Sequence, residues 1–276
     1  MKRHLIALDL DGTLLYNWST LDERTKDYLI KFKDQGHQIV IATGRPFRSS
    51  IKFYRALNLD APMINYNGGL VSWPGNADFD EINIKLDRAA VVDIFKANEP
   101  YIENAFCEIK DDIYLMKESE DIVDLLHFFN NARLFVGDFK KTLPGDVNGF
   151  IIVAKKGKGH LIEAYVKANY PNKVISRNWG DDYQFIIELY TPHNNKGRAL
   201  EYVANYYDIP KERVIAFGDG NNDLEMIDYA GIGVAVQNAC EELKAIADVV
   251  SPHTHQEHTI EKFLDQYFAE KKVESD

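Results

Sequence analysis

An acidic turn directly after the first apolar segment constrains the fold of this chain more than any other feature. The apolar residues 5–8 predict a buried β-strand, and the chain continues as Asp9-Leu10-Asp11-Gly12-Thr13. Because side chains alternate along a strand, Asp9 and Asp11 begin on the same side of it. Gly12 permits a sharp turn that a side chain would obstruct. Two carboxylates at the C-terminal end of a buried strand lie where open α/β sheets place their sites.

Alternating strand and helix patterns flank a central block of different character. Short connections between alternating strands and helices favour a parallel sheet. The central block combines hairpins with helices, which is typical of an α+β module with an antiparallel sheet. The sequence therefore predicts an α/β fold with a Rossmann-like parallel sheet core at 1–83 plus 190–276 and an inserted α+β domain at 84–189. The strands expected in the core cover residues 5–8, 38–42, 63–66, 213–217, 232–236 and 248–250.

Charge and composition exclude several classes of function. The 276 residues include 43 acidic and 32 basic side chains, a net charge of −11, which argues against a nucleic-acid partner. A small phosphorylated ligand is still compatible with this charge, because a bound cation can make the local electrostatic potential positive. Cys107 and Cys240 lie far apart in the sequence and belong to no paired motif, so no disulfide framework is expected. This is typical of a protein in a reducing compartment. No apolar run is long enough for a membrane span, so the sequence predicts a cytoplasmic protein with no membrane partner.

Polar clusters recur at the strand ends and helix starts of the predicted core. Thr43-Gly44-Arg45 follows the second strand, Lys196 opens the first helix after the central block, and the loop from Gly218 to Asp223 follows the next strand. Each cluster also has a structural explanation when it is considered alone. Thr43-Gly44-Arg45 can simply end a strand, Lys196 can be an ordinary solvated lysine, and the loop from Gly218 to Asp223 can cap the next helix. Their occurrence together at one edge of the sheet favours a site, because helix N-termini there attract anions.

These side chains suit phosphoryl transfer. The Asp9 carboxylate can attack phosphorus and form an aspartyl-phosphate, and Asp11 can protonate the leaving oxygen and later deprotonate water. Thr43 offers a hydroxyl and Gly44 an unobstructed amide to phosphate oxygens. Lys196 supplies a fixed positive charge.

A hard cation is expected beside these groups. Asp219 and Asp223 add oxygen ligands which, with Asp9, suffice for an octahedral Mg²⁺ that keeps some waters. Asn222 can orient an acid or donate a hydrogen bond to phosphate.

Four segments resemble the four motifs of the haloacid-dehalogenase-like (HAD) phosphatases. They are Asp9-Leu10-Asp11-Gly12-Thr13, Thr43-Gly44-Arg45, Lys196-Gly197 and Gly218-Asp219-Gly220-Asn221-Asn222-Asp223. The insertion after Asn67-Gly68-Gly69 is similar to the α/β cap of the Cof-type subfamily. The resemblance covers essentially the whole chain and implies that residues 84–189 form a cap that sets substrate specificity.

The resemblance also implies a role for each motif position. Asp9 would be the nucleophile and Asp11 the general acid/base, with its backbone carbonyl on Mg²⁺; Thr43 and Lys196 would hold the phosphate and complete the catalytic set. The expected metal-binding positions are Asp9, Asp11, Asp219 and Asp223. The expected substrate-binding positions are Leu10, Gly12, Thr13, Thr43, Gly44, Arg45, Lys196 and Asn222.

The expected activity is Mg²⁺-dependent hydrolysis of phosphate monoesters of small metabolites. By resemblance these are sugar phosphates, flavin or riboflavin-pathway compounds, or pyridoxal phosphates. Two alternatives stay open at this point: a phosphomutase, and a non-catalytic sensor of a phosphorylated metabolite. We expect a monomer or a weak homodimer.

A few other residues leave their roles open. Arg45 can face the substrate or pair with a carboxylate of the cap. Residues 179–182 suggest a cap loop that reaches the site. The histidines His253, His255 and His258 approach metal-ligand spacing, but no fourth ligand is evident, so they are interpreted as a surface turn.

Overall fold

A computed structural model describes residues 2–127, 132–179 and 185–273 of the chain. Contacts between residues divide it into two compact units. The first unit contains residues 1–45, 50–81 and 195–276, and the second contains residues 46–49 and 82–194. The α/β fold with an additional sheet domain is as predicted, whereas the cap boundaries at 84 and 189 stay a prediction.

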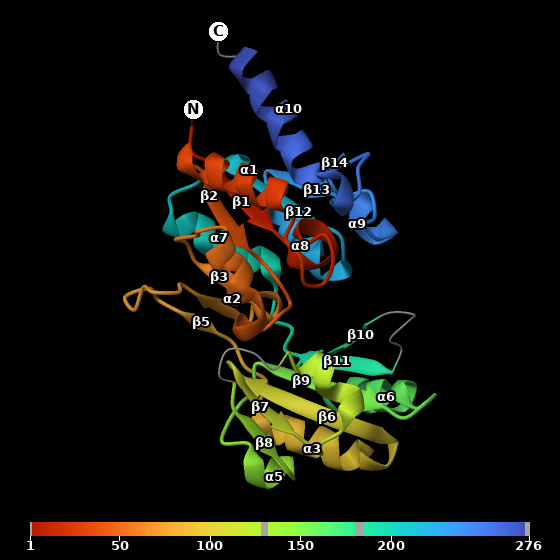
Figure 1. Ribbon diagram of the computed structural model, residues 1–276. Helices are drawn as coiled ribbons and strands as arrows, with labels where there is room; N and C mark the ends of the chain where they lie inside the picture. The colour runs from red at the N-terminus through yellow and green to blue at the C-terminus, as the bar shows by residue number, and fades with distance from the viewer. Residues whose placement is uncertain (1, 128–131, 180–184, 274–276) are drawn as a thin grey trace. The chain divides into compact units, whose positions relative to one another are not determined.

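The first unit is built on a five-stranded parallel sheet of order β14-β13-β12-β1-β2. Both ends of the chain contribute to it, since β1 lies between β2 and β12, with Leu5 opposite Gln38 on one side and Val214 on the other (Figure 1). All four residues of β1 are fully buried, which explains their continuous apolar sequence. The strands are β1 Leu5–Leu8, β2 Gln38–Ile41, β12 Val214–Gly218, β13 Ile232–Ala235 and β14 Val249–Val250.

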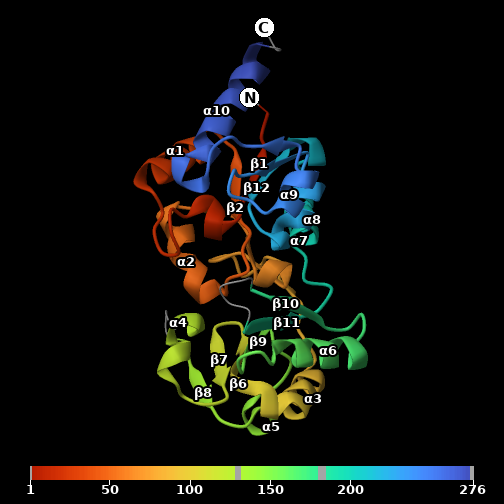
Figure 2. The ribbon, with the colours of Figure 1, turned by 90° about the vertical axis from the view of Figure 1, so that its right-hand side faces the viewer.

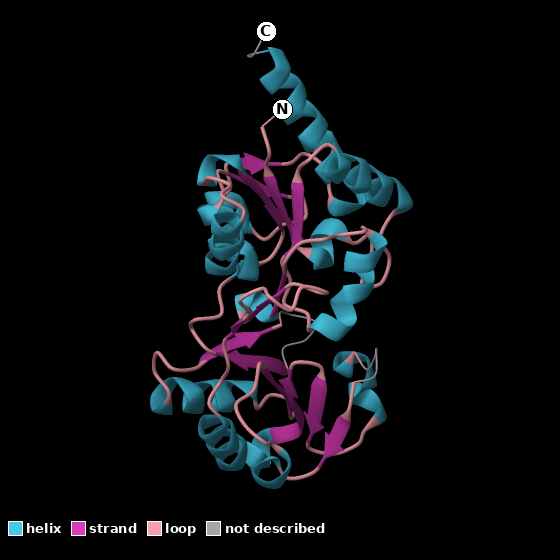
Figure 3. Ribbon diagram, turned by 90° about the vertical axis from the view of Figure 1, so that its left-hand side faces the viewer, coloured by secondary structure: helices cyan, strands magenta, loops and turns pink. Residues whose placement is uncertain are grey.

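Helices cover both faces of this sheet (Figures 2 and 3). One face carries α1 Glu23–Asp34, α2 Phe47–Ala56 and α10 Thr259–Val273. The other carries α7 Lys196–Tyr206, α8 Leu224–Tyr229 and α9 Glu241–Ile246. None of the described helices is long and apolar enough to cross a membrane.

The third predicted strand departs from the parallel pattern. Residues Met63–Asn65 form β3, which pairs antiparallel with β4 Leu70–Ser72 in a small sheet of order β3-β4-β5, where β5 is Ile82–Asn83. An isolated parallel bridge between Ala42 and Ile64 links β3 to the segment after β2, and Asn65 donates from Nδ2 to the backbone oxygen of Arg45 at 3.0 Å. Three successive positive φ angles, at Tyr66, Asn67 and Gly68, turn the chain back on itself between β3 and β4.

The second unit is an α+β module around a six-stranded sheet of order β10-β11-β9-β6-β7-β8. Its largest apolar cluster joins the sheet to α3 and α6, and a smaller cluster lies beside α4 (Figure 2). Its strands are β6 Ile102–Ile109, β7 Asp112–Leu115, β8 Leu134–Val136, β9 Gly149–Ala154, β10 Ile175–Asn178 and β11 Ile186–Tyr190. Its helices are α3 Arg88–Asn98, α4 Val123–Leu126, α5 Phe139–Thr142 and α6 Gly159–Asn169.

Candidate active site

Asp9 directly follows β1, and a tight turn of residues Leu10–Leu14 begins there. The turn depends on Gly12, whose φ is +74°. A Cβ at Gly12 would lie 2.2 Å from Oδ2 of Asp219, which follows β12. Glycine is therefore required here both by backbone conformation and by the close approach of the second acidic loop.

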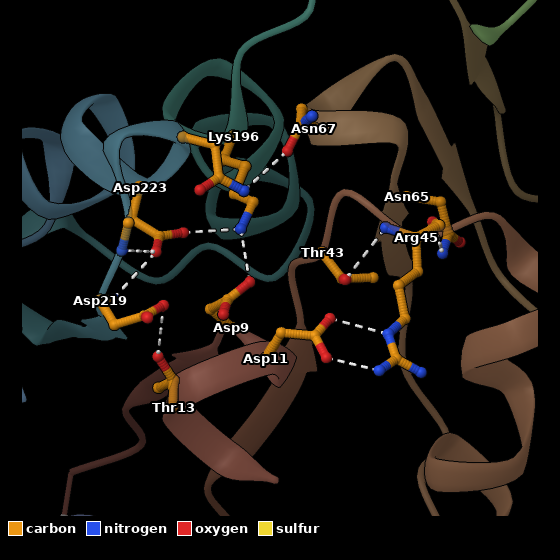
Figure 4. A network of polar contacts seen from close by, with 12 residues as sticks. Asp9, Asp11, Thr13, Thr43, Arg45, Asn65, Asn67, Lys196, Asp219 and Asp223 are labelled. Atoms are coloured by element: carbon orange, nitrogen blue, oxygen red, sulfur yellow. Dashed lines mark hydrogen bonds and ion pairs between the residues drawn. The ribbon is translucent and has the colours of Figure 1, made fainter. Parts of the chain in front are cut away.

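Lys196 links the acidic groups of the two loops (Figure 4). Its Nζ donates hydrogen bonds of 2.6 Å to Oδ1 of Asp9 and 2.6 Å to Oδ1 of Asp223. Lys196 and Asp223 are fully buried and Asp9 is nearly so. Lys196 is the first residue of α7, and Asn195 caps that helix by accepting a hydrogen bond from the backbone N–H of Arg198. Lys196 is thus a buried cation between two carboxylates, and the alternative interpretation as an ordinary solvated lysine does not hold.

Asp223 also holds the shape of its own loop. Its Oδ2 accepts hydrogen bonds from the backbone N–H groups of Asp219 at 3.0 Å and Gly220 at 3.1 Å. Both carboxylate oxygens of Asp223 are therefore engaged, one by the lysine and one by the loop. The Asp219 carboxylate, which accepts a 3.4 Å hydrogen bond from the Thr13 hydroxyl, keeps an oxygen to spare.

The electrostatics of this cluster are dominated by burial. Burial raises the pKa of Asp9 well above its usual range, and the charge of Asp223 raises it further, against the opposing influence of Lys196. Burial and Asp223 likewise raise the pKa of Asp219 to about 7. Burial would lower the pKa of Lys196, but attraction to Asp223 and Asp9 outweighs it, so that this pKa is raised. The cluster therefore disfavours three ionised carboxylates beside a single ammonium group.

The residues present fit a divalent cation. Asp9, Asp219 and Asp223 each offer one oxygen, and these atoms lie within 4.8 Å of one another. Three carboxylates and one lysine leave two negative charges, which a divalent ion would offset and so return the raised pKa values toward normal. An all-oxygen set of this kind suits Mg²⁺, which keeps waters in its remaining positions.

The side chain of Asp11 lies outside this cluster. Arg45 donates to it twice, from Nε to Oδ2 at 2.7 Å and from Nη2 to Oδ1, and also donates from Nη2 to the backbone carbonyl of Trp18 at 2.6 Å. Both residues belong to the first unit. The sequence suggested that Arg45 faces the substrate or pairs with a carboxylate of the cap. In the structure its partner is Asp11 instead. The metal role expected for Asp11, through its backbone carbonyl, stays a prediction.

The remaining motif residues surround the cluster. Thr43 is buried and its hydroxyl accepts a 3.1 Å hydrogen bond from the backbone N–H of Arg45. Asn222 donates from Nδ2 to Oδ1 of Asn67 at 3.0 Å, and a Cβ at Gly44 would lie 3.0 Å from the same oxygen. Leu10 is fully buried, and its apolar side chain offers no hydrogen bond to a phosphate, so its substrate role stays a prediction.

Asn67 is a site residue that the sequence reasoning did not assign. It joins the loop after β3 to the loop after β12 through Asn222. The available signal was the Asn-Gly-Gly segment that follows the third strand. Gly68 packs against the same region, because a Cβ there would lie 2.3 Å from the backbone oxygen of Asn195.

Two further predictions concerned a cap loop and a group of histidines. Residues 180–182 of the expected cap loop are outside the described residues. Of the three histidines near the C-terminus, His258 contacts two carboxylates, with Nδ1 3.2 Å from Oε1 of Glu261 and 3.6 Å from Oδ1 of Asp22.

Comparison with known proteins identifies the family. The model of the haloacid dehalogenase-like hydrolases matches residues 6–264. The chain belongs to this family. A 5-amino-6-(5-phospho-D-ribitylamino)uracil phosphatase of Bacillus subtilis is 35% identical over 97% of this chain and 98% of its own length.

Solved structures of the family share the fold. A haloacid dehalogenase-like hydrolase from Bacteroides thetaiotaomicron, 26% identical, matches with a TM-score of 0.82 over 96% of this chain and 100% of that one. A Thermotoga maritima protein, 23% identical, matches with a TM-score of 0.80 over 96% and 97%. This haloacid dehalogenase-like hydrolase is a phosphatase acting on phosphoric monoesters, in line with the phosphatase name of the Bacillus subtilis relative.

Proposed function

We propose that the protein is a Mg²⁺-dependent phosphatase that works through an aspartyl-phosphate on Asp9. The observation that carries this proposal is the group of three carboxylates, Asp9, Asp219 and Asp223, in which Lys196 binds the buried pair of Asp9 and Asp223. Lys196 holds Oδ1 of Asp9, and among the described residues none donates a hydrogen bond to the other oxygen, Oδ2. A carboxylate oriented by one oxygen and open at the other is suited to attack.

In the first step, Oδ2 of Asp9 forms a bond to phosphorus as the bond from phosphorus to the leaving oxygen breaks. Asp11, in its protonated form, gives its proton to that oxygen. Lys196, the hydroxyl of Thr43 and the backbone N–H of Gly44 stabilise the negative charge of the transferring group. Asp9 and Asp219 would hold the Mg²⁺, with Asp223 supporting them, and the ion supplies charge stabilisation and alignment of the phosphoryl oxygens.

In the second step, water attacks the phosphorus of the aspartyl-phosphate. Asp11, left ionised by the first step, takes the proton from water, and the bond between phosphorus and Asp9 breaks. Inorganic phosphate leaves and Asp11 is again protonated. One group thus serves as acid in the first step and as base in the second, and the proton that Asp11 takes from water restores its starting form.

For the substrate, we propose a phosphorylated sugar alcohol attached to a flat ring, of the kind found on the riboflavin pathway. The support is the name and 35% identity of the Bacillus subtilis phosphatase, which matches along nearly its whole length. Residues 84–189 are proposed to supply the specificity. Sugar phosphates and pyridoxal phosphate are the competing substrates in the same class.

The test is phosphate release from a panel of these compounds, with Mg²⁺ or with a chelator, for the wild type and Asp9→Asn. Asp78→Asn, the same change at an exposed position, is the matched control. We expect Mg²⁺-dependent release that Asp9→Asn abolishes and the control retains. Release that survives in Asp9→Asn would refute the nucleophile, and turnover without free phosphate, dependent on a bisphosphate activator, would indicate a mutase.

A further inference from the structure

A second group of ligand-type atoms joins the starts of two helices of the first unit, α1 and α10. Asp22 caps α1 and Thr25 lies in its first turn, while His258 precedes α10 and Glu261 lies in its first turn. We call these four residues the α1–α10 cluster. They bring together segments more than 230 positions apart, and none of them takes part in the proposed phosphoryl transfer.

Five of the six distances among the four facing atoms of this cluster lie between 2.8 and 3.6 Å, a spacing that suits tetrahedral coordination. His258 Nδ1 lies 3.2 Å from Glu261 Oε1 and 3.6 Å from Asp22 Oδ1. Thr25 Oγ1 lies 2.8 Å from Glu261 Oε1, 3.4 Å from Asp22 Oδ1 and 3.4 Å from His258 Nδ1. Ligand bonds of 2.0–2.1 Å to a tetrahedral zinc ion give ligand-to-ligand distances of about 3.3 Å, in the middle of this range.

Hydrogen bonds leave one carboxylate oxygen of this cluster without a donor. The backbone N–H of Thr25 donates to Asp22 Oδ1 at 3.0 Å, its hydroxyl donates to Glu261 Oε1 at 2.8 Å, and Nδ1 of His258 can carry one further proton. The Glu261 side chain is 3% exposed, and its second oxygen, Oε2, has no hydrogen-bond partner among the described residues. A buried carboxylate left short of donors is costly, and a cation in the cluster would relieve that cost.

We propose that the α1–α10 cluster is a binding site for a divalent transition-metal ion of the zinc type. The carboxylates of Asp22 and Glu261 balance the +2 charge of the ion. The imidazole nitrogen of His258 binds zinc-type ions better than it binds Mg²⁺, and the Thr25 hydroxyl or a water completes four-coordination. His258 and Asp22 have side chains 27% and 35% exposed, which gives the ion a route from solvent. The site is structural: it fastens the start of α10 to the start of α1.

The test measures Zn²⁺ binding to the full chain with Mg²⁺ in excess, so that the active-site carboxylates are occupied. His258→Asn removes the imidazole while suiting the left-handed conformation of this residue, whose φ is +60°. Asp22→Asn removes a charge while keeping the helix cap. His255→Asn is the matched control in the same turn, and Asp219→Asn removes a carboxylate of the other cluster.

We expect about one Zn²⁺ per chain to survive dialysis in the wild type, in His255→Asn and in Asp219→Asn. His258→Asn and Asp22→Asn are expected to weaken binding at least tenfold. Zn²⁺ at about 100 times its Kd should raise Tm by roughly 5 °C in the first three proteins and much less in the other two. Co²⁺ in place of Zn²⁺ should give the strong visible absorption of a tetrahedral site.

Equal Zn²⁺ retention in His258→Asn and the wild type would overturn the proposal. So would a Zn²⁺-dependent rise in Tm that Asp219→Asn abolishes, since the ion would then lie at the active site. A Tm of the wild type that responds to pH through His258 but not to Zn²⁺ would also overturn it, because the cluster would then be a protonated histidine between two carboxylates.

Discussion

Arg45 forms a two-pronged ion pair with Asp11, the residue proposed to carry the proton in both chemical steps. The planar guanidinium matches the carboxylate geometry and fixes its orientation, while the carbonyl of Trp18 fixes the guanidinium in turn. In the proposed mechanism Arg45 is therefore a positioning residue for Asp11. The ion pair holds the ionised carboxylate in place to act as base in the second step, and it must open for Asp11 to carry a proton in the first.

The first prediction follows from this pair. Arg45→Lys keeps the positive charge but cannot make the paired hydrogen bonds, so the general acid/base should be poorly oriented. We expect kcat to fall about tenfold with KM changed less than about threefold, measured by steady-state phosphate release. If KM rises instead and kcat is retained, Arg45 binds substrate rather than positioning Asp11.

The second prediction concerns the buried lysine. Lys196→Met leaves Asp9 and Asp223 without their shared cation, and an uncompensated buried charge typically costs about 3–5 kcal/mol of stability. Denaturant unfolding in a chelator should show a loss of this order. Lys31→Met, at an exposed position of α1, should change stability little.

A second substitution shows whether the stability lost in Lys196→Met comes from unpaired charges or from lost packing. Adding Asp223→Asn to Lys196→Met removes one unpaired charge and should recover part of the lost stability. No recovery would mean that the lysine stabilises the fold through packing alone.

The third prediction compares two glycines to separate the effect of a steric clash from the effect of backbone strain. Gly68 and Gly36 both have positive φ, +93° and +96°. A Cβ at Gly68 would lie 2.3 Å from the backbone oxygen of Asn195, whereas a Cβ at Gly36 would meet nothing within 4 Å. Alanine at either position costs about 1–2 kcal/mol in conformational strain, and only Gly68→Ala must also displace the start of α7.

Gly68→Ala should therefore lower both stability and turnover, because the start of α7 carries Lys196. Gly36→Ala should lower stability alone. Circular dichroism on heating and phosphate release measure the two effects. Equal turnover in the two variants would show that the contact between Gly68 and Asn195 does not position the lysine.

The sequence was most informative where parallel strands end. Asp9 follows β1 and Asp219 follows β12, and these neighbouring strands run in the same direction, so their ends had to meet at one edge. Lys196 was predictable as the start of a helix on that edge. These features depend on local patterns and on the geometry of a parallel sheet.

Features created by tertiary packing were not predictable in this way. The reversal before β4 uses positive φ at Tyr66 and Asn67, which carry no glycine signal. The strand β8, Leu134–Val136, is apolar but only three residues long and largely exposed, so its apolar run is too short to indicate a strand. Asp11 pairs with Arg45, 34 residues away, and His258 pairs with Asp22, across nearly the whole chain. No local pattern fixes such partners.

The fourth prediction concerns stability in acid and rests on a buried histidine of the same unit. His37 is 1% exposed and stacks on Phe32, with ring centroids 4.3 Å apart, beside Phe268 of α10. Its Nδ1 accepts a hydrogen bond from the backbone N–H of His4, and its Nε2 has no partner among the described residues. Burial, with a smaller contribution from the neighbouring His4, lowers the pKa of His37 to about 4.

The sign of the effect follows from the two protonation states. An unfolded histidine titrates near pH 6.5, so below that pH the unfolded chain binds a proton that the folded chain refuses. The stability contributed by neutral His37 is complete above about pH 6.5 and is lost as the pH falls toward 4, by up to about 3 kcal/mol. His37→Gln, which cannot titrate, should unfold with a shallower pH dependence over this interval, even where its stability at pH 8 is lower. His160→Gln, at an exposed position, should retain the wild-type slope, and an unchanged slope in His37→Gln would show that other groups cause the acid sensitivity.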